Sequence, residues 1–361
     1  MAKLGEVCAF QSGGTPSKNK PEYFGGEIPW ISTTALNGGK INETDAVAWI
    51  TPKAIRESAA KIVPANSIMI GTRVGIGKVA INTVEMSTSQ DVISLINIDE
   101  DKWYKPYLCK LLLSKKDYFN SQARGATIKG IKIDIVANID VPEIDYATQR
   151  KIAETLSKVD ELIAFREQQL AKMDDLVKAR FVEMFGDPYM NNKHYPLRKG
   201  ESFFKLSNGK TVPEDKRLSN GVPAYGGNGI SWYTNESLFN HDTIVVGRVG
   251  FQSGNVHIAK GPLWITDNAM YMSSCDFSQY NLIFLINLME HIDFTKFQDA
   301  GDLKKITQKP FMQYEYICPP LPLQNQFAAF VERVDRQKQT VQQSLEKLEL
   351  MKKALMQEYF G

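Results

Sequence analysis

The chain has 361 residues, of which 43% are apolar and 23% charged, and its formal net charge at pH 7 is +2. This composition is typical of a globular protein with about two domains, and it excludes a low-complexity or strongly basic chain. No apolar run approaches the roughly 18 residues of a membrane-spanning helix, and MAKLGEVCAF at the N-terminus lacks the features of an export signal. We therefore expect a cytoplasmic protein with no membrane contact.

The first half of the chain, residues 1–145, contains a strand, turn and returning strand at residues 68–81. The segment IMIGTRVGIGKVAI places apolar runs on both sides of a glycine-bearing turn that holds Arg73. Further on, eight basic residues and one acid, Asp117, fall between Lys102 and Lys132. Such a local excess of positive charge can bind phosphates, although a solvated helix face would look the same.

A long helix is predicted next, over residues 146–186, and a second one over residues 322–361. Apolar residues recur at alternating spacings of four and three, which is typical of a coiled-coil seam. Prolines precede each helix, and Gly186-Asp187-Pro188 ends the first. The predicted seam residues are Ile152, Leu156, Val159, Ile163, Leu170 and Met173 in the first helix, and Phe327, Val331, Val334, Val341, Leu345 and Leu348 in the second.

An internal repeat at an offset of 175 residues connects the two halves. QRKIAETLSKVD at 149–160 matches QNQFAAFVERVD at 324–335, and Phe185-Gly186 matches Phe360-Gly361. The hairpin at 68–81 has a looser counterpart, IVVGRVGFQSGNVHI at 244–258, whose glycine-bearing turn also holds an arginine, Arg248. Ser89-Gln90 corresponds roughly to Asp267-Asn268.

The repeat predicts an α/β (α+β) protein with two pseudo-repeated globular domains separated by two long antiparallel helices that form a coiled coil. Its parts are residues 1–145, 146–186, 187–321 and 322–361. About 38 helical residues span roughly 55–60 Å, so the helices can act as a ruler. Pairing of either helix with a helix of another protein stays open as an alternative.

Catalytic and metal-binding signatures are missing from the sequence. Gly209-Lys210-Thr211 ends like a phosphate-binding loop, but Phe204 stands where that loop needs glycine. Asp187-Pro188-Tyr189 is one proline short of an amino-methyltransferase motif. The four cysteines lie far apart and the four histidines are scattered, so we expect no zinc site, no disulfide framework and no catalytic residues.

Several segments resemble Type I restriction-modification specificity subunits. They are KLGEV, SGGTPSKNKPEYFGGEIPWISTTAL, Gly71-Thr72-Arg73, the junction MFGDPYMNNKHYPL and the two Gln-x-x-Ile/Phe-Ala repeats. The resemblance covers essentially the whole chain, although GVPAYGGNGISWY in the second half departs from EIPWISTTAL in the first. The globular halves would then be target-recognition domains, and the long helices would be spacers.

The resemblance implies binding of double-stranded DNA, in which each domain reads one half of a bipartite target. It also implies two methyltransferase subunits that modify adenine N6 with S-adenosylmethionine, and restriction subunits that use ATP and Mg in the full complex. The chain itself would carry no cofactor and would not be an enzyme; it would serve host defence by directing DNA methylation and restriction.

DNA binding needs phosphate anchors and base-reading groups. The predicted phosphate anchors are basic residues near the glycine-bearing turns: Lys18, Lys20, Arg73, Lys129, Lys132, Lys210, Arg248, Lys304 and Lys305. The predicted base readers are polar or aromatic loop residues: Thr15, Asn19, Ser32, Thr33, Thr34, Gln90, Tyr225, Asn228, Ser231 and Asn268. Some of these residues could instead shape loops, fill the core or brace the hairpins.

Three other functions remain open. A self-contained adenine methyltransferase or nuclease would need a cofactor or metal motif. A coiled-coil adaptor would bind partners without selecting a DNA sequence. The specificity subunit of another two-part restriction class, or a silent recombining variant, would look the same in sequence.

Overall fold

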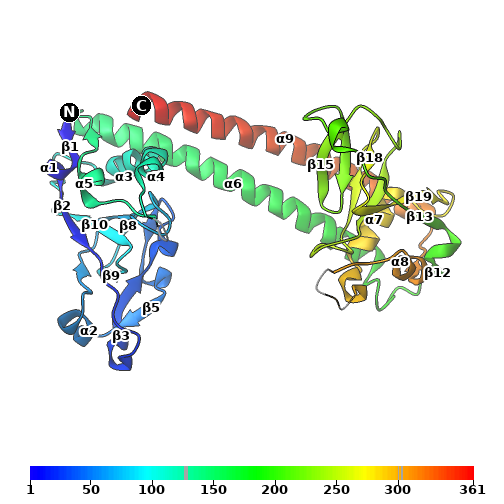
Figure 1. The fold of residues 1–361 in the computed structure, drawn as a ribbon, viewed down its shortest axis with the longest axis horizontal. Coiled ribbons are helices and arrows are strands. Elements are labelled where there is room, and N and C mark those ends of the chain that lie inside the picture. Colours follow the sequence, from blue (N-terminus) through cyan, green and yellow to red (C-terminus); the bar gives the residue numbers. More distant parts are fainter. Residues whose placement is uncertain (126–128, 300, 302–303) are drawn as a thin grey trace. The chain divides into compact units, whose positions relative to one another are not determined.

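The computed structural model describes residues 1–125, 129–299, 301 and 304–361. The chain forms two compact units. The first holds residues Met1–Phe165 and Ser344–Gly361, and the second holds Arg166–Gln343. Each unit therefore contains one globular domain with the adjoining parts of two long helices, and both chain termini belong to the first unit (Figure 1).

The described residues of the first unit form two larger sheets and one small one. One has the strand order β2 (Ala9–Ser12), β10 (Val92–Ile96), β7 (Ile68–Gly71), β8 (Val79–Asn82) and β4 (Lys40–Ile41). The other has the order β5 (Ala48–Ile50), β3 (Phe24–Ile31), β9 (Met86–Thr88) and β6 (Ile62–Val63). The antiparallel pairing of β7 with β8 confirms the hairpin predicted at residues 68–81.

Both faces of the β7–β8 hairpin are buried. Ile68 and Ile70 join the large core cluster of the first unit, whereas Met69 joins a second cluster on the opposite face. This alternation follows from the two-residue period of a strand, and it explains why the segment is apolar throughout. The helices of the domain are α1 (Leu4–Val7), α2 (Pro52–Glu57), α3 (Lys105–Ser114), α4 (Lys116–Gln122) and α5 (Ile133–Ala137).

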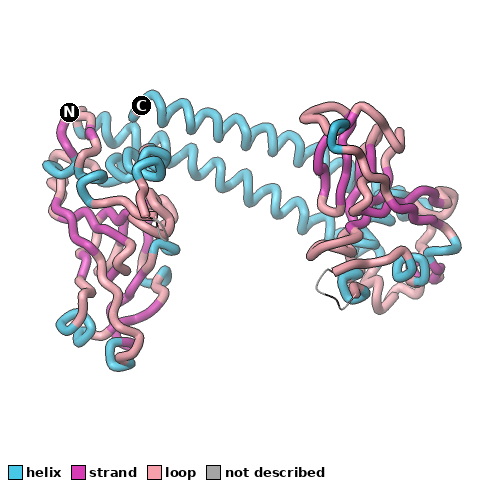
Figure 2. Tube along the Cα trace, viewed as in Figure 1, coloured by secondary structure: helices cyan, strands magenta, loops and turns pink. Residues whose placement is uncertain are grey.

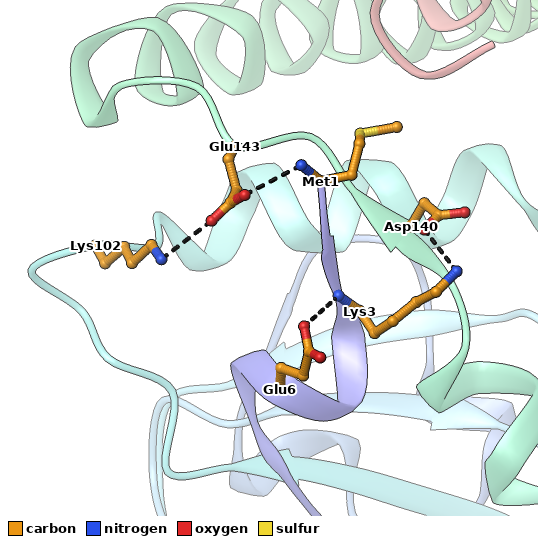
Figure 3. A network of polar contacts seen from close by, with 6 residues as sticks. All are labelled: Met1, Lys3, Glu6, Lys102, Asp140 and Glu143. Carbon is orange, nitrogen blue, oxygen red and sulfur yellow. Dashed lines mark hydrogen bonds and ion pairs between the residues drawn. The ribbon is translucent and has the colours of Figure 1, made fainter.

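A short two-stranded sheet holds the N-terminus beside the entry to the first long helix. Strand β1 (Ala2–Lys3) pairs antiparallel with β11 (Asp140–Val141). Figure 3 shows the ion pairs around it: the N-terminal ammonium lies 3.1 Å from Glu143 Oε2, and Lys3 Nζ lies 2.6 Å from Asp140 Oδ1. These charges are exposed, so they position the strand more than they stabilise it.

The second unit repeats this architecture. Its four-stranded sheet has the order β13 (Phe204–Asn208), β19 (Ala269–Cys275), β16 (Thr243–Gly247) and β17 (Val256–Ala259). A three-stranded sheet has the order β15 (Gly229–Thr234), β14 (Val222–Gly226) and β18 (Trp264–Ile265). The small sheet is β12 (Leu197–Lys199) with β20 (Glu315–Ile317), and the helices are α7 (Leu282–Glu290) and α8 (Lys309–Gln313).

The two domains agree in strand register as well as in strand order. In the first, β3 runs parallel to β9 and pairs Ile31 with Thr88. In the second, β14 runs parallel to β18 and pairs Tyr225 with Ile265. Sequence similarity between these segments is weak, so the duplication is clearer in backbone pairing than in side chains.

The long helices are α6 (Tyr146–Phe185) and α9 (Leu321–Phe360), which Figure 2 shows as uninterrupted helices. Their antiparallel pairing is seen directly in the second unit. Phe185 packs against Phe327 with ring centroids 5.5 Å apart, and eleven residues earlier on α6 Asp174 pairs with Lys338, eleven residues later on α9. In the first unit, Asp160 Oδ1 lies 2.6 Å from Lys352 Nζ.

The seam residues predicted from the heptad spacing are at least half-buried. Ile152, Leu156, Val159, Phe327, Val331, Val334, Val341 and Leu345 are buried, and Ile163, Leu170, Met173 and Leu348 are half-buried. Residues near each helix start also join a domain core: Leu156 belongs to the core cluster of the first unit and Val331 to that of the second. The helices are thus built into the domains as well as paired with each other.

The repeated glutamine has the same role at the start of each helix. Gln149 is 1% exposed; its Oε1 accepts a hydrogen bond from Tyr104 N, and its Nε2 donates to the carbonyls of Lys102 and Ile144. Gln324 is 0% exposed and makes the matching bonds, accepting from Asn281 N and donating to the carbonyls of Gln279 and Pro319. Each glutamine therefore fastens its helix to the adjacent domain.

The repeated Phe-Gly has a matching role at the end of each helix. Phe185 is fully buried and lies 4.7 Å from Phe284 between ring centroids, and Phe360 lies 5.3 Å from Tyr107. Lys115 Nζ also donates to the carbonyl of Phe360. Each long helix thus starts in one unit, on a glutamine, and ends in the other, on a phenylalanine.

Candidate nucleic-acid interface

Loops from distant parts of the sequence meet at one end of the two sheets of the first unit. Gly13 N donates to Val92 O at 3.0 Å, which joins the loop after β2 to the start of β10. Ser89 N donates to Ile31 O at 2.9 Å, and Gln90 N donates to Thr15 Oγ1 at 3.4 Å. These bonds gather the loops that hold Thr15, residues 32–34 and Gln90.

The turn between β7 and β8 is fastened to the same place. Thr72 N donates to Asp91 O at 2.8 Å, and Ile131 N donates to Thr72 O at 2.8 Å. The Arg73 guanidinium lies 3.7 Å from Asp91 Oδ1 and keeps half of its surface in solvent. The turn therefore brings Arg73 beside the segment that carries Lys129 and Lys132.

A basic cavity of about 700 Å³ lies against this turn. Among the described residues that line it, three are basic and none is acidic: Arg73, Gln122, Arg124, Gly130, Ile131, Lys132 and Ile135. A cavity with this lining suits an anionic oxygen better than an apolar ligand.

The second unit has the same loop cluster. Gly209 N donates to Ala269 O at 3.0 Å, and Thr266 N donates to Tyr225 O at 2.9 Å. Arg248 N donates to Asn268 O and Ile306 N donates to Arg248 O, each at 3.0 Å. The cavity here is about 460 Å³, again with basic and no acidic side chains among the described residues that line it: Asn208, Arg248, Met270, Thr307, Gln308, Lys309 and Met312.

These bonds correct the sequence alignment of the two turns by one residue. Arg248 takes the backbone position of Thr72, not of Arg73, and Asn268 takes that of Asp91. Arg248 follows Gly247 directly, whereas Thr72 stands between Gly71 and Arg73. The second turn is also one residue longer, because Gly77 N closes on Gly71 O in the first unit and Gly254 N closes on Gly247 O in the second. Gln90 then corresponds to Asp267.

A tryptophan braces the same loop in both units, but from different strands. Trp30 Nε1 on β3 donates to Gly14 O at 3.0 Å, and Trp264 Nε1 on β18 donates to Lys210 O at 2.8 Å. Gly14 and Lys210 occupy matching positions, because Gly14 N donates to Thr88 O and Lys210 N donates to Ile265 O. Trp30 thus has a structural role next to the predicted base readers.

The predicted base readers differ in exposure. Thr15, Thr34 and Gln90 are exposed, as are Asn228, Ser231 and Asn268. Ser32 is half-buried and bonds Thr34 through their hydroxyls at 2.8 Å, and Tyr225 is half-buried. Thr33 is only 4% exposed, and its methyl group lies against Gly71. The Thr33 side chain is therefore packed inside the domain. Base reading by Thr33 is the one prediction in this group that burial contradicts.

The remaining predicted anchors are surface residues. Lys129, Lys132, Lys210, Lys304 and Lys305 are exposed within or beside the loop clusters. Lys18, Asn19 and Lys20 are exposed in the loop that follows Thr15. Lys20 Nζ donates to Tyr23 Oη at 2.9 Å, so Lys20 also braces its own loop.

The basic run between Lys102 and Lys132 is not one phosphate-binding surface. Lys110 is buried and pairs with Asp160 at 2.6 Å, Lys105 pairs with Glu100 at 2.6 Å, and Lys102 pairs with Glu143 at 3.3 Å. A count of basic residues in the sequence cannot distinguish these ion-paired lysines from Arg124, Lys129 and Lys132, which lie near the turn. Arg124 and Lys309 line the basic cavities although neither was selected as an anchor.

The described residues offer no grouping of three or more His, Cys, Asp or Glu side chains able to hold a metal ion. Burial raises the pKa of Cys8 and of Cys109 to about 12, which keeps both thiols protonated. In the described part of the chain, no helix has the length and apolar character needed to cross a bilayer.

The described residues thus form one fold twice, and each copy has a basic cavity at the corresponding turn. The family model for the Type I restriction modification DNA specificity domain matches residues 1–174 and again residues 193–350. The chain therefore belongs to the family of Type I restriction-modification specificity subunits, which are built from DNA-recognition domains.

Individual relatives agree with this assignment. The MjaIX specificity subunit of Methanocaldococcus jannaschii is 30% identical over 232 residues, which cover 59% of this chain and 53% of that protein. The match to this relative thus spans only about half of its length. The EcoprrI specificity subunit of Escherichia coli is 23% identical over 354 residues, which cover 92% of this chain and 86% of that protein.

Solved structures show the same fold. The Type I S subunit from M. genitalium superposes with a TM-score of 0.65 at 17% identity, covering 99% of this chain and 95% of that one. A chain from a structural study of complex assembly and conformational transition in the type I system has a TM-score of 0.61 at 16% identity, covering 99% and 96%. The predicted architecture of two similar domains and two long helices is thereby confirmed.

Proposed function

We propose that the two domains each read one half of a bipartite double-stranded DNA target. The observation that carries the proposal is the duplicated loop cluster, in which each unit has a basic cavity against the glycine-bearing turn to which the loops are hydrogen-bonded. Phosphate contacts from the basic groups would fix the register, and Asn, Gln, Ser and Thr would reach base edges in the major groove.

The proposed phosphate anchors are the basic residues around the two turns, all exposed except Arg248, which is half-buried. Arg73, Lys129 and Lys132 serve the first domain, and Lys210, Arg248, Lys304 and Lys305 serve the second; Lys18 and Lys20 extend the first set. The proposed base readers are Thr15, Asn19, Ser32, Thr34 and Gln90, and then Tyr225, Asn228, Ser231 and Asn268. Thr33 is left out because it is buried.

We further propose that α6 and α9 set the gap between the two half-targets. Each helix has 40 residues, which corresponds to about 60 Å at 1.5 Å per residue. Their repeated sequence also provides two similar surfaces for two identical methyltransferase subunits. The chemistry, adenine N6 methylation and ATP-dependent cleavage, would reside in the partner subunits, and this chain would supply recognition alone.

The direct test is single-molecule sequencing of methyladenine in native genomic DNA, with and without this gene. We expect the gene to produce one split motif with a fixed gap. If the methylome does not change, the chain is co-expressed with a matching methyltransferase subunit. Absence of any split motif in that strain would refute sequence reading and favour a coiled-coil adaptor.

A further inference from the structure

One apolar side chain stands exposed in the turn of each loop cluster. Phe251 is 93% exposed and Val74 is 58% exposed. Exposure of a phenylalanine leaves a large apolar surface in water, and the side chain contributes little to folding there. Neither residue was among the base readers predicted from the sequence.

The two residues lie at the same distance from the end of their turns. Each lies three residues before the glycine that closes its turn, Gly77 in the first unit and Gly254 in the second. In both turns the next residue accepts a hydrogen bond from the amide three positions later: Gly75 O from Lys78 N, and Gln252 O from Asn255 N. An exposed apolar residue therefore occurs twice at one site of the fold.

Hydrogen bonds to neighbouring segments hold both turns in place. Gly250 N donates to Lys304 O at 2.8 Å, and Gln298 Nε2 donates to Ser253 O at 2.6 Å. In the first unit, Ile131 N donates to Thr72 O at 2.8 Å. The exposed side chains are thus presented on braced backbone and sit beside the proposed phosphate anchors.

The chemistry of these side chains limits what they can recognise. Neither has a hydrogen-bonding group, yet each turn is hydrogen-bonded to a segment that carries proposed phosphate anchors, Lys304 in the second unit and Lys132 in the first. In the major groove the apolar feature of a base edge is the 5-methyl group of thymine. A valine and a phenylalanine can both contact a methyl group, whereas valine is a poor wedge between stacked bases.

We infer that Phe251 and Val74 are apolar base contacts, each packed against a thymine methyl group in the half-target of its own domain. This inference rests on the proposed function, because it assigns two specificity-determining residues within the same DNA site.

The test uses the complete chain assembled with its methyltransferase subunits and duplexes that carry the target. Each thymine is replaced in turn by uracil, which removes only the methyl group. We expect Kd of the unaltered complex to rise about fourfold at one position in the second half, the factor for one buried methyl group. Phe251→Ala should bind the thymine and uracil duplexes equally, and Phe251→Leu should keep most of the difference.

Val74→Ala is the matched control, because it should remove methyl sensitivity in the first half and leave the second half unchanged. The inference is overturned if no position responds to uracil. It is also overturned if Phe251→Ala weakens thymine and uracil duplexes alike while 2-aminopurine fluorescence shows that Phe251 unstacks a base step. A complex of the unaltered chain that selects no split target would instead refute the proposed function.

Discussion

At the residue scale, position in the fold separates charges that look alike in sequence. Lys110 and Lys132 both belong to the basic run of the first domain, but Lys110 is buried against Asp160 whereas Lys132 lines an open basic cavity. Contacts with phosphate contribute affinity without sequence information. Only the exposed group is expected to act on DNA.

Lys132→Ala should weaken DNA binding by a similar factor on every sequence and reduce the slope of log K against log salt by about 0.9. The measurement is a salt titration of the assembled complex on target and non-target duplexes. Lys105→Ala removes an equal charge that is paired with Glu100 and should leave the slope unchanged. A change confined to the target duplex would show that Lys132 reads bases.

Gln149→Leu should lower the free energy of unfolding by about 1–3 kcal/mol for the buried polar groups left without a partner. The substitution leaves Tyr104 N and the carbonyls of Lys102 and Ile144 unsatisfied, in a place where Gln149 is 1% exposed. Urea unfolding measures the change. Gln168→Leu, at an exposed position of the same helix, is the control; equal effects from both would mean that the buried bonds contribute nothing.

At the element scale, the helix pair is fixed by charges as well as by its apolar seam. Asp160 receives hydrogen bonds from Lys110 on α3 and from Lys352 on α9, so it joins three helices of the first unit. Burial acts to raise the pKa of Asp160, but the two lysines outweigh it and the pKa lies below its ordinary value. A depressed carboxylate pKa means that deprotonation stabilises the folded state.

Asp160→Asn should therefore destabilise the protein at neutral pH, and the difference from the unaltered chain should shrink as the pH falls. The stabilisation is complete above the unfolded pKa of about 3.9 and is lost as the pH falls below it, through the depressed folded pKa. Thermal unfolding between pH 7 and pH 3 measures the difference. A difference that stays constant over that range would mean that the carboxylate charge has no part in holding the helices.

The elements also show what the sequence could predict. Heptad spacing and the repeats at Gln149 and Gln324 were enough for both helices and for the duplication, because these signals are local. The sheets were harder, since β2 pairs with β10 about eighty residues away. Both turns hold an arginine, but Arg73 and Arg248 occupy different backbone positions, because Arg248 follows its glycine directly and Arg73 stands one residue further on.

The candidate site was predicted in part for the same reason. The loops that hold Thr15, Gln90 and Arg73 were selected by residue type, and the fold brings them together. Burial of Thr33 and of Lys110 depends on neighbours distant in sequence. The exposed apolar pair, Val74 and Phe251, was not selected from the sequence, because an isolated apolar residue gives no local sign that it is exposed.

At the scale of the whole molecule, changing the length of the two long helices tests whether they set the gap between the half-targets. An insertion of four helical residues after Gln168, with a matching one after Gln343, adds about 6 Å to each helix, against about 3.4 Å per base pair. The gap in the methylated motif should lengthen by one or two base pairs while both half-targets stay the same. Methylome sequencing reads both quantities, and an unchanged gap or altered half-targets would show that the helices do not set the distance.

Both long helices are attached to the domains by the same kinds of residue, and this repetition affects how new variants of the protein can arise. In each domain, a buried glutamine bonds the start of one long helix to the domain, and a buried phenylalanine packs the end of the other helix into its core. Under the proposed function, we expect that a domain that keeps these two contacts can be exchanged without changes in the rest of the chain. If a population contains m variants of the first domain and n variants of the second, recombination between them can produce about m × n different DNA targets. A point mutation, in contrast, changes one contact with the DNA at a time.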